Sequence, residues 1–355
     1  MAAEKRPASN VFESQQLVVK RQKSDANLQP GNALTISRGG SGLAQGRTSG
    51  LKAPVMELSG HTAEIFAAKF DPSGNLIASA SMDRSINLWR TYGNCDNFGQ
   101  LLGHKGAVLD VQWSRDSRTV FSASADATLA SWDLDTGTRI RKHVGHDGVI
   151  NCLDITRRGE DLMLSGSDDG SFAIWDPRQK AAVDYIETEY PITAVAFSEA
   201  GSEIFTGGVT NSISVWDIRK KAVVYTLQGH QDTITSLQIS PDSQSLLSNS
   251  FDGTVRTWDV RPFAPTNRHL KTYDGAPPGI ERNLIRASWD NKGERIVAGS
   301  GDRTVVVWDV RSGKLLYKLP GHKGTVNDVR FTPAEEPIIL SASSDRSLIL
   351  GELGK

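Results

Sequence analysis

From Pro54 onward, short runs of hydrophobic residues alternate with polar residues and are separated by turn residues. In the first unit, IFAAKF and LIASAS flank the turn DPSGN, and a tight turn at SMDRS leads into INLWR. The longer loop TYGNCDNF then leads to an outer strand. Alternation with a period of two residues predicts β-strands, so each unit is expected to form a four-stranded sheet. A single sheet of this kind has two apolar faces and needs neighbouring copies for stability.

The unit recurs along the chain. Tryptophan stands at Trp89, Trp132, Trp175, Trp216, Trp258 and Trp308, with spacings of 43, 43, 41, 42 and 50 residues. A Gly-His pair precedes most units, with the histidines at His61, His104, His146, His230 and His322. A seventh copy, SDRSLILGEL, matches SMDRSINLWR except that Gly351 replaces the tryptophan. This period and these motifs are typical of a WD-repeat β-propeller blade.

The two ends of the repeat region predict how the ring closes. The last unit stops at its third strand, LILGEL, and one unassigned strand, APVMELSG, precedes the first Gly-His pair. We expect Val55 to Leu58 to supply the outer strand of the last blade, because this pairing would remove a free sheet edge. The prediction is an all-β, seven-bladed WD-repeat propeller over residues 53–355, with residues 53–59 as the closing strand.

Residues 1–52 differ from the repeats in composition and charge. They are rich in Gly, Ser, Gln and Asn, and carry eight basic and three acidic side chains, so their net charge is +5 within a total of −1. Such a segment cannot bury enough apolar surface to offset its ordering entropy, which predicts a flexible, disordered basic tail. Lys20, Arg21 and Lys23 form a K-R-x-K cluster that indicates nuclear import. Any contact with RNA is expected to be indirect or through this tail.

Other features limit the class of protein. Only Cys95 and Cys152 are present, which argues against a disulfide scaffold and favours a reducing compartment. No apolar run is long enough to span a membrane, and we expect no secretory signal. Phosphate-binding loops, HExxH and clustered Cys/His metal spacings are absent from the sequence, so we expect no cofactor, metal, small-molecule substrate or enzymatic activity.

One set of side chains resembles a hydrolase triad, because histidine, serine and aspartate recur together with the tryptophan. Its members are His61, Asp83 and Trp89; His104, Asp126 and Trp132; His146, Asp169 and Trp175; and His230, Asp252 and Trp258. A catalytic triad occurs once, whereas this set is copied at blade period, so we interpret it as a structural network. The unit ending at Trp216 has Thr210 in place of the aspartate and lacks Gly-His, and joint loss avoids stranding a buried polar group. His143 and His269 lie outside the pattern and are expected at the surface.

Several stretches contain residues that the repeated motifs do not explain. They are VKRQK, YGNCDNF, WDVRPFAP, LYKLPGHKGTVNDVRF and EEPIILSASSDRSLILGEL. Together they resemble the family of 40-kilodalton WD-repeat proteins of the U5 small nuclear ribonucleoprotein. The resemblance implies a nuclear, non-catalytic spliceosome scaffold whose partners are the largest U5 protein and the neighbouring GTPase. Four W-D-x-R motifs leave open a second class, a substrate receptor of a cullin-type ubiquitin ligase.

One end of the ring is the predicted protein-binding surface. Two positions vary between units, the residue before the turn aspartate and the residue five after the histidine. They hold Met82, Ala125, Asp168, Phe251, Gly301 and Ser344 at the first position, and Phe66, Leu109, Asn151, Thr235 and Asn327 at the second. Exposed bulky apolar side chains usually mark a contact, so Phe66, Met82 and Phe251 are the candidate anchors. The alternative is that these three side chains pack against neighbouring loops.

Overall fold

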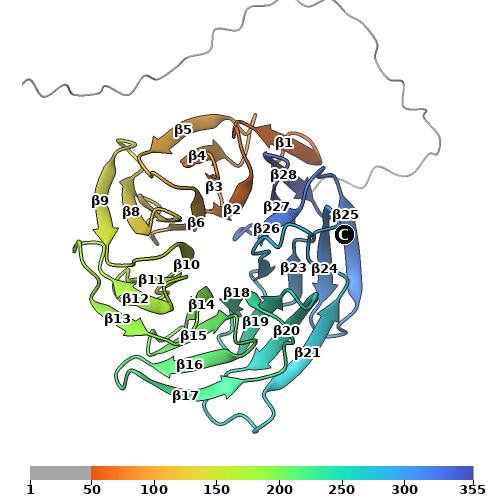
Figure 1. Ribbon diagram of the computed structural model, residues 1–355. Helices are drawn as coiled ribbons and strands as arrows, with labels where there is room; N and C mark the ends of the chain where they lie inside the picture. The colour runs from red at the N-terminus through yellow and green to blue at the C-terminus, as the bar shows by residue number, and fades with distance from the viewer. Residues whose placement is uncertain (1–48, 355) are drawn as a thin grey trace, which may run out of the picture. The chain divides into compact units, whose positions relative to one another are not determined.

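The computed structural model describes residues 49–354, which form seven four-stranded antiparallel sheets arranged as a ring (Figure 1). Six blades are continuous in sequence: blade 1 is β2–β5, blade 2 is β6–β9, blade 3 is β10–β13, blade 4 is β14–β17, blade 5 is β18–β21 and blade 6 is β22–β25. Blade 7 combines β26, β27 and β28 with β1. The predicted seven-bladed propeller is therefore confirmed.

The strands are short, mostly five or six residues. Blades 1 and 2 comprise β2 (Ile65–Phe70), β3 (Leu76–Ser81), β4 (Ser85–Arg90), β5 (Asn97–Leu102), β6 (Val108–Trp113), β7 (Thr119–Ser124), β8 (Thr128–Asp133) and β9 (Arg139–Val144). Blades 3 and 4 comprise β10 (Ile150–Ile155), β11 (Met163–Ser167), β12 (Ser171–Trp175), β13 (Asp184–Glu187), β14 (Ile192–Phe197), β15 (Glu203–Gly208), β16 (Ile213–Asp217) and β17 (Ala222–Leu227). Blades 5 and 6 comprise β18 (Ile234–Ile239), β19 (Ser245–Ser250), β20 (Thr254–Asp259), β21 (His269–Asp274), β22 (Ala287–Trp289), β23 (Arg295–Ala298), β24 (Thr304–Asp309) and β25 (Leu315–Pro320). Blade 7 comprises β26 (Val326–Phe331), β27 (Ile338–Ser343), β28 (Ser347–Glu352) and β1 (Val55–Ser59).

The ring closes through the predicted strand at the start of the repeat region. Strand β1 pairs antiparallel with β28, from Val55 opposite Gly351 to Ser59 opposite Ser347. Leu58 is buried in the closing sheet, whereas Val55 on the same strand is exposed. The pairing joins the start of the propeller to its end and removes the free edge of β28.

The core lies between the blades. Seven clusters of buried hydrophobic residues are found in the described part of the chain, and each joins two neighbouring blades. The cluster between blades 7 and 1, for example, packs Leu348 and Leu350 against Ile65 and Ile77. Each sheet therefore buries both faces, as expected for blades that are unstable alone.

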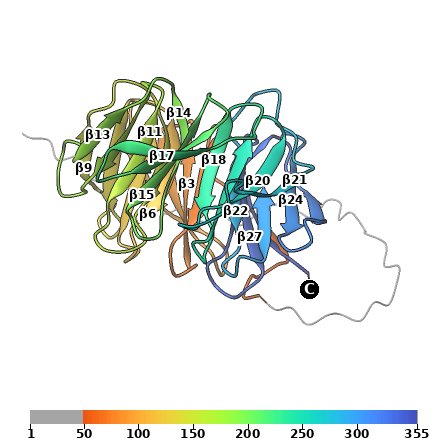
Figure 2. The same cartoon turned by 90° about the horizontal axis from the view of Figure 1, so that it is seen from below.

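A β-bulge marks the inner strand in six blades. The pairing register between inner strand and second strand shifts at Phe66, Leu109, Asn151, Thr193, Thr235 and Asn327. Bulges re-aim a side chain relative to the regular alternation. Seen edge-on, the blades stand side by side and their connecting loops form the two faces (Figure 2).

No helix in the described part of the chain is long and apolar enough to cross a membrane.

Candidate functional site

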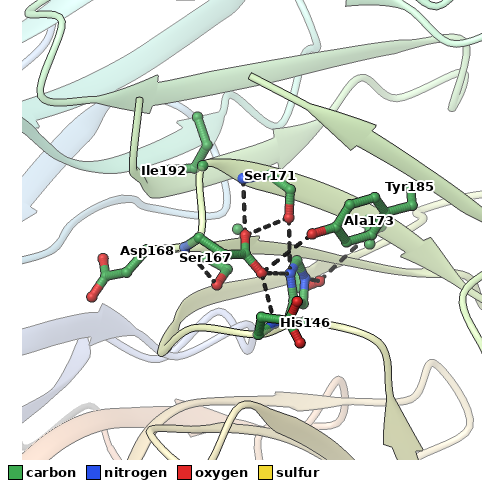
Figure 3. Close-up of polar contacts among 12 residues, drawn as sticks. His146, Ser167, Asp168, Ser171, Ala173, Tyr185 and Ile192 are labelled. Atoms are coloured by element: carbon green, nitrogen blue, oxygen red, sulfur yellow. Dashed lines mark hydrogen bonds and ion pairs between the residues drawn. The ribbon is translucent and has the colours of Figure 1, made fainter. Parts of the chain in front are cut away.

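The recurring polar set forms a hydrogen-bonded network at one end of a blade. In blade 3, His146 lies beside Ser171 and Tyr185 (Figure 3). Its Nδ1 is 2.9 Å from Asp169 Oδ2, and its Nε2 is 2.7 Å from Ser165 Oγ. Ser165 Oγ also accepts a hydrogen bond from Trp175 Nε1 at 2.7 Å. The chain Asp–His–Ser–Trp thus links the tight turn before β12 to the buried end of that strand.

The same geometry occurs in five blades. The distance from histidine Nδ1 to the aspartate is 2.8–3.1 Å, and the distance from Nε2 to the serine is 2.7–2.8 Å. The members are His61, Asp83 and Trp89; His104, Asp126 and Trp132; His146, Asp169 and Trp175; His230, Asp252 and Trp258; and, without a tryptophan, His322 and Asp345. The structure therefore brings every predicted network residue into contact with its partners.

The network holds its charges in one state. Burial alone would raise the pKa of Asp169, but hydrogen bonds from Ser171 and His146 outweigh that effect and lower it to about 2. Burial lowers the pKa of His146 despite the neighbouring carboxylate. In blades 1, 2, 3 and 5 the serine hydroxyl is occupied by an indole N–H and an imidazole nitrogen within the core, so it is not presented to a substrate. We interpret the set as a brace for the turn and the strand.

Two blades replace the network with other contacts. In blade 4, Trp216 Nε1 donates to Thr206 Oγ1 at 2.9 Å. In blade 6, Trp308 Nε1 donates to the carbonyl oxygen of Asp274 at 2.9 Å, and Asp302 pairs with Lys318 at 2.6 Å. Residues 275–286 stand where other blades have their Gly-His loop, and the carbonyl of Pro277 accepts from the Gly301 amide. Gly301 is needed there because an added Cβ would lie 2.2 Å from Gly279 Cα.

The expectation that His143 and His269 lie at the surface was wrong for His143. His143 is fully buried, with Nε2 2.7 Å from Ser131 Oγ and Nδ1 donating to the Gln179 carbonyl at 2.8 Å. These contacts link blade 2 to blade 3. His269 is partly exposed and packs edge-on against Trp258. No repeat motif marks His143, because it lies on the outer strand β9 and its partners come from β8 and from the next blade.

The variable residue five after the histidine is the bulge residue of the inner strand. Three of the residues named for this position bond the next blade: Asn151 to the Ile192 carbonyl, Thr235 to that of Ile285, and Asn327 to that of Ile65. Thr193 bonds the Ile234 carbonyl in the same way. Asn151, Thr235 and Asn327 were placed on the predicted protein-binding surface, but their side chains serve the contact between blades. Phe66 and Leu109 carry no polar group that could make this bond.

The residues before the turn aspartate lie at one end of the ring. In blades 1, 2, 3, 5 and 7 the backbone N–H of this residue bonds a carbonyl in the loop before the inner strand. Met82 is 54% exposed and Phe66 is partly buried, and both belong to blade 1. Phe251 is in blade 5, where the Arg282 guanidinium lies 5.8 Å from its ring centre. Sequence reasoning missed Ile280, which is fully exposed near Arg282 in the long loop of blade 6.

A buried ion cluster on the axis was also missed. Arg286, which precedes β22, reaches across to Asp110 of blade 2, with Nη1 2.5 Å from Oδ1, and donates to the Leu109 carbonyl at 3.0 Å. Lys69 lies 3.1 Å from Asp110, and burial lowers the pKa of Lys69 to about 8 although that carboxylate opposes the change. The cluster continues in blade 7, where Arg330 Nε is 2.9 Å from Asp328.

This cluster lines an axial cavity of about 480 Å³ bounded by residues of all seven blades. Three cations and two carboxylates, Lys69, Arg286, Arg330, Asp110 and Asp328, stand in close contact there. Asp110 also accepts a hydrogen bond from the Leu153 amide of blade 3. Because each carboxylate is paired with two of the cations and the contacts join blades 1, 2, 3, 6 and 7, we interpret the cluster as a tie across the ring.

The remaining candidates fall into two groups. Lys20, Arg21 and Lys23 lie outside the described residues. Cys95 and Cys152 are buried and free, and burial raises the pKa of both thiols. No group of three or more metal-ligating side chains occurs in the residues searched, which are the described ones.

Comparison with known proteins agrees with the fold. Residues 52–90, 270–309 and 313–350 match the model described as WD domain, G-beta repeat. Residues 76–261 match the model described as Nucleolar protein 10-like, N-terminal domain.

Three named relatives cover most of the chain. Pre-mRNA-splicing factor cwf17 of Schizosaccharomyces pombe is 50% identical over 86% of this chain and 90% of its own length. The U5 small nuclear ribonucleoprotein 40 kDa proteins of Dictyostelium discoideum and Homo sapiens are 44% and 46% identical, over 91% and 94% of this chain and 92% and 95% of their own lengths. The chain therefore belongs to the WD-repeat β-propellers and, among them, to the family of the U5 small nuclear ribonucleoprotein 40 kDa protein.

Proposed function

We propose that this chain is a non-catalytic protein-interaction scaffold of the U5 small nuclear ribonucleoprotein and takes part in pre-mRNA splicing. The observation that carries the proposal is the identity of 44–50% with the named splicing proteins over 86% or more of the chain. Within that role, we propose docking on the largest U5 protein beside its GTPase neighbour, with no direct small-molecule substrate.

The architecture supports a scaffold. Seven inter-blade cores and the axial ion cluster hold the ring rigid, while two loop faces and the outer strands remain available to partners. The repeated histidine network offers no free nucleophile, because its serine hydroxyls are buried and already bonded. Met82 and Ile280 are exposed apolar side chains on loops, which is the kind of group that forms interface anchors.

The experiment is affinity purification of the tagged full chain from nuclear extract, followed by mass spectrometry and RNA sequencing, with the tag alone as control. We expect U5 RNA and splicing proteins to be enriched. Dominant recovery of a cullin adaptor would instead favour the ubiquitin-ligase receptor, whose W-D-x-R arginines here include Arg178 and Arg261. Both arginines pair with the aspartate two residues earlier, Asp176 and Asp259.

A nuclear location follows from the proposed role and has a separate test. Replacing Lys20, Arg21 and Lys23 with alanine should reduce nuclear accumulation of a fluorescent fusion, because the K-R-x-K cluster is the candidate import signal. Lys292, Lys314 and Lys323 changed to alanine provide a variant with the same loss of charge outside that cluster. Unchanged localisation of the first variant would show that the cluster is not the signal.

A further inference from the structure

Blade 4 differs from the five network blades at the site of the imidazole. In those blades the histidine stands four residues before the first residue of the inner strand, so the corresponding residue of blade 4 is Thr188, four before Ile192. Thr188 Oγ1 donates to the Gly170 carbonyl of the preceding blade at 2.7 Å. The side chain is therefore engaged with blade 3, away from the network position.

A cavity of about 580 Å³ lies at this point. Its lining includes Tyr190, Pro191, Ile192, Thr206, Trp216 and Val223. Thr206 and Trp216 are the counterparts of the network serine and tryptophan, and Thr210, which replaces the turn aspartate, also lines the cavity. The indole of Trp216 is partly exposed, whereas Trp89, Trp132, Trp175 and Trp258 are 0–3% exposed.

The hydroxyl group of Thr206, which lines the cavity, has a hydrogen-bond donor that is not used within the described part of the chain. Thr206 is 3% exposed, and its Oγ1 accepts from Trp216 Nε1, but its hydroxyl proton has no acceptor among the described residues. In blades 1, 2, 3, 5 and 7 the corresponding serine contacts an imidazole nitrogen. A buried hydroxyl in this state favours an acceptor atom, which a basic side chain lacks and a backbone carbonyl of an extended segment can supply.

The charge of the lining selects the ligand. Glu187 and Glu189 are exposed carboxylates that line the cavity, and no lining residue carries a positive charge. Neither glutamate forms an ion pair with a described residue. Tyr190 is 50% exposed and Val223 is 43% exposed, so the walls present aromatic and aliphatic surface beside the two carboxylates.

We propose that this cavity is a docking pocket for an arginine or lysine side chain from an extended segment of a partner protein. Long basic side chains place an apolar stem along apolar walls and a cationic head at carboxylates and aromatic rings. The pocket lies in blade 4 at the same end of the ring as Met82 and Phe251, because Thr210 holds the turn position that follows each of them in its own blade. Its existence does not depend on the identity of the U5 partner.

The test uses full-length protein labelled with 5-fluorotryptophan and observed by ¹⁹F NMR, with the Trp216 signal assigned by its loss in Trp216→Phe. The probes are Ac-Gly-Arg-Gly-NH₂ and, as the uncharged match, Ac-Gly-Gln-Gly-NH₂. We expect the arginine peptide to shift the Trp216 signal saturably at low salt, and the glutamine peptide to leave it unmoved. No shift, or equal shifts with both peptides, would overturn the proposal.

Two variants test the source of the binding. Glu187→Gln with Glu189→Gln should weaken binding of the arginine peptide about five-fold or more. Glu281→Gln with Glu294→Gln makes the same charge change elsewhere and should leave that binding unchanged. Restoring the repeat with Glu187→Gly, Thr188→His and Thr210→Asp should fill the cavity and remove the shift. Unaltered binding of the arginine peptide to the Glu187→Gln, Glu189→Gln variant would overturn the proposal, even if the restored variant does not fold. A shift of the Trp216 signal with spermidine but not with the peptide would also overturn it.

Discussion

At the residue scale, the network shows how a catalytic-looking set can serve structure alone. His146 carries the same residue types on either side as a triad histidine, yet its serine is bonded to Trp175 inside the blade. Burial lowers the pKa of His146, His230 and His322, and hydrogen bonds from neighbouring hydroxyls and imidazoles lower the pKa of Asp169 and Asp252 to about 2 in spite of burial. The folded state therefore favours neutral histidine beside ionised aspartate.

This charge state predicts acid sensitivity. The unfolded chain takes up protons on its histidines below about pH 6.5, while the folded chain resists protonation at His146, His230 and His322, so stability falls as pH falls from 7.5 to 5. The aspartates add a further loss only below about pH 4, because the unfolded carboxylates begin to bind protons there while Asp169 and Asp252 in the folded chain resist protonation down to about pH 2. Thermal unfolding across this range should show a falling midpoint, with a shallower slope in His146→Gln. A midpoint that is flat or rises toward pH 5 would contradict the assigned charge state.

At the element scale, β1 is a small strand with a large role in closure. It pairs with β28 over five residue pairs, and alternate side chains face opposite sides, so Leu58 is 3% exposed while Val55 is 62% exposed. The packing of Leu58 against blade 7 and blade 1 joins the two ends of the propeller.

The two positions give a matched prediction. Leu58→Ala should lower the free energy of unfolding by about 2–5 kcal/mol, because it leaves a cavity in the closing core. Val55→Ala on the same strand should change it by less than about 0.5 kcal/mol, because its side chain is exposed. Urea denaturation of the two variants measures the difference. Equal effects would contradict closure by β1.

Most elements could be predicted from the chain, for a physical reason. Gly-His, the turn aspartate and the tryptophan recur at near-constant spacing, and each marks a fixed point in the blade, so the blade count and the closing strand followed. What escaped prediction depends on neighbouring blades: the burial of His143 and the inter-blade bonds of Asn151 and Asn327. A period read along one chain does not show which side chain the next blade contacts.

At the scale of the whole molecule, Arg286 ties distant blades across the axis. Its partners Asp110 and Asp328 are 176 and 42 residues away in sequence. Both aspartates stand six residues after a Gly-His histidine, but Arg286 belongs to a blade without Gly-His, so the repeat does not show that these side chains meet. The guanidinium and the carboxylates are almost fully buried, with side-chain exposures of 7% for Arg286 and 4% for Asp110.

Removing Arg286 alone should destabilise the fold more than removing Arg286 together with the charge of Asp110. Arg286→Leu should lower the free energy of unfolding by about 3–5 kcal/mol, because it removes a main counter-ion of the buried Asp110. Adding Asp110→Asn to that variant should recover part of the loss, because the uncompensated charge is gone. Urea denaturation of the single and double variants completes the cycle. Additive losses would contradict direct coupling between the two side chains.

The measurement that tests the account most directly is recovery of the largest U5 protein by a variant of the loop face. Phe66→Ala, Met82→Ala and Phe251→Ala together should fold with a near-native thermal midpoint and lose most of that partner in quantitative affinity purification, because these side chains are the proposed anchors. Val183→Ala, Val224→Ala and Leu270→Ala remove exposed apolar side chains elsewhere and serve as the matched control. If the first variant is folded and recovers the U5 protein as well as the native chain does, the proposed docking face is contradicted.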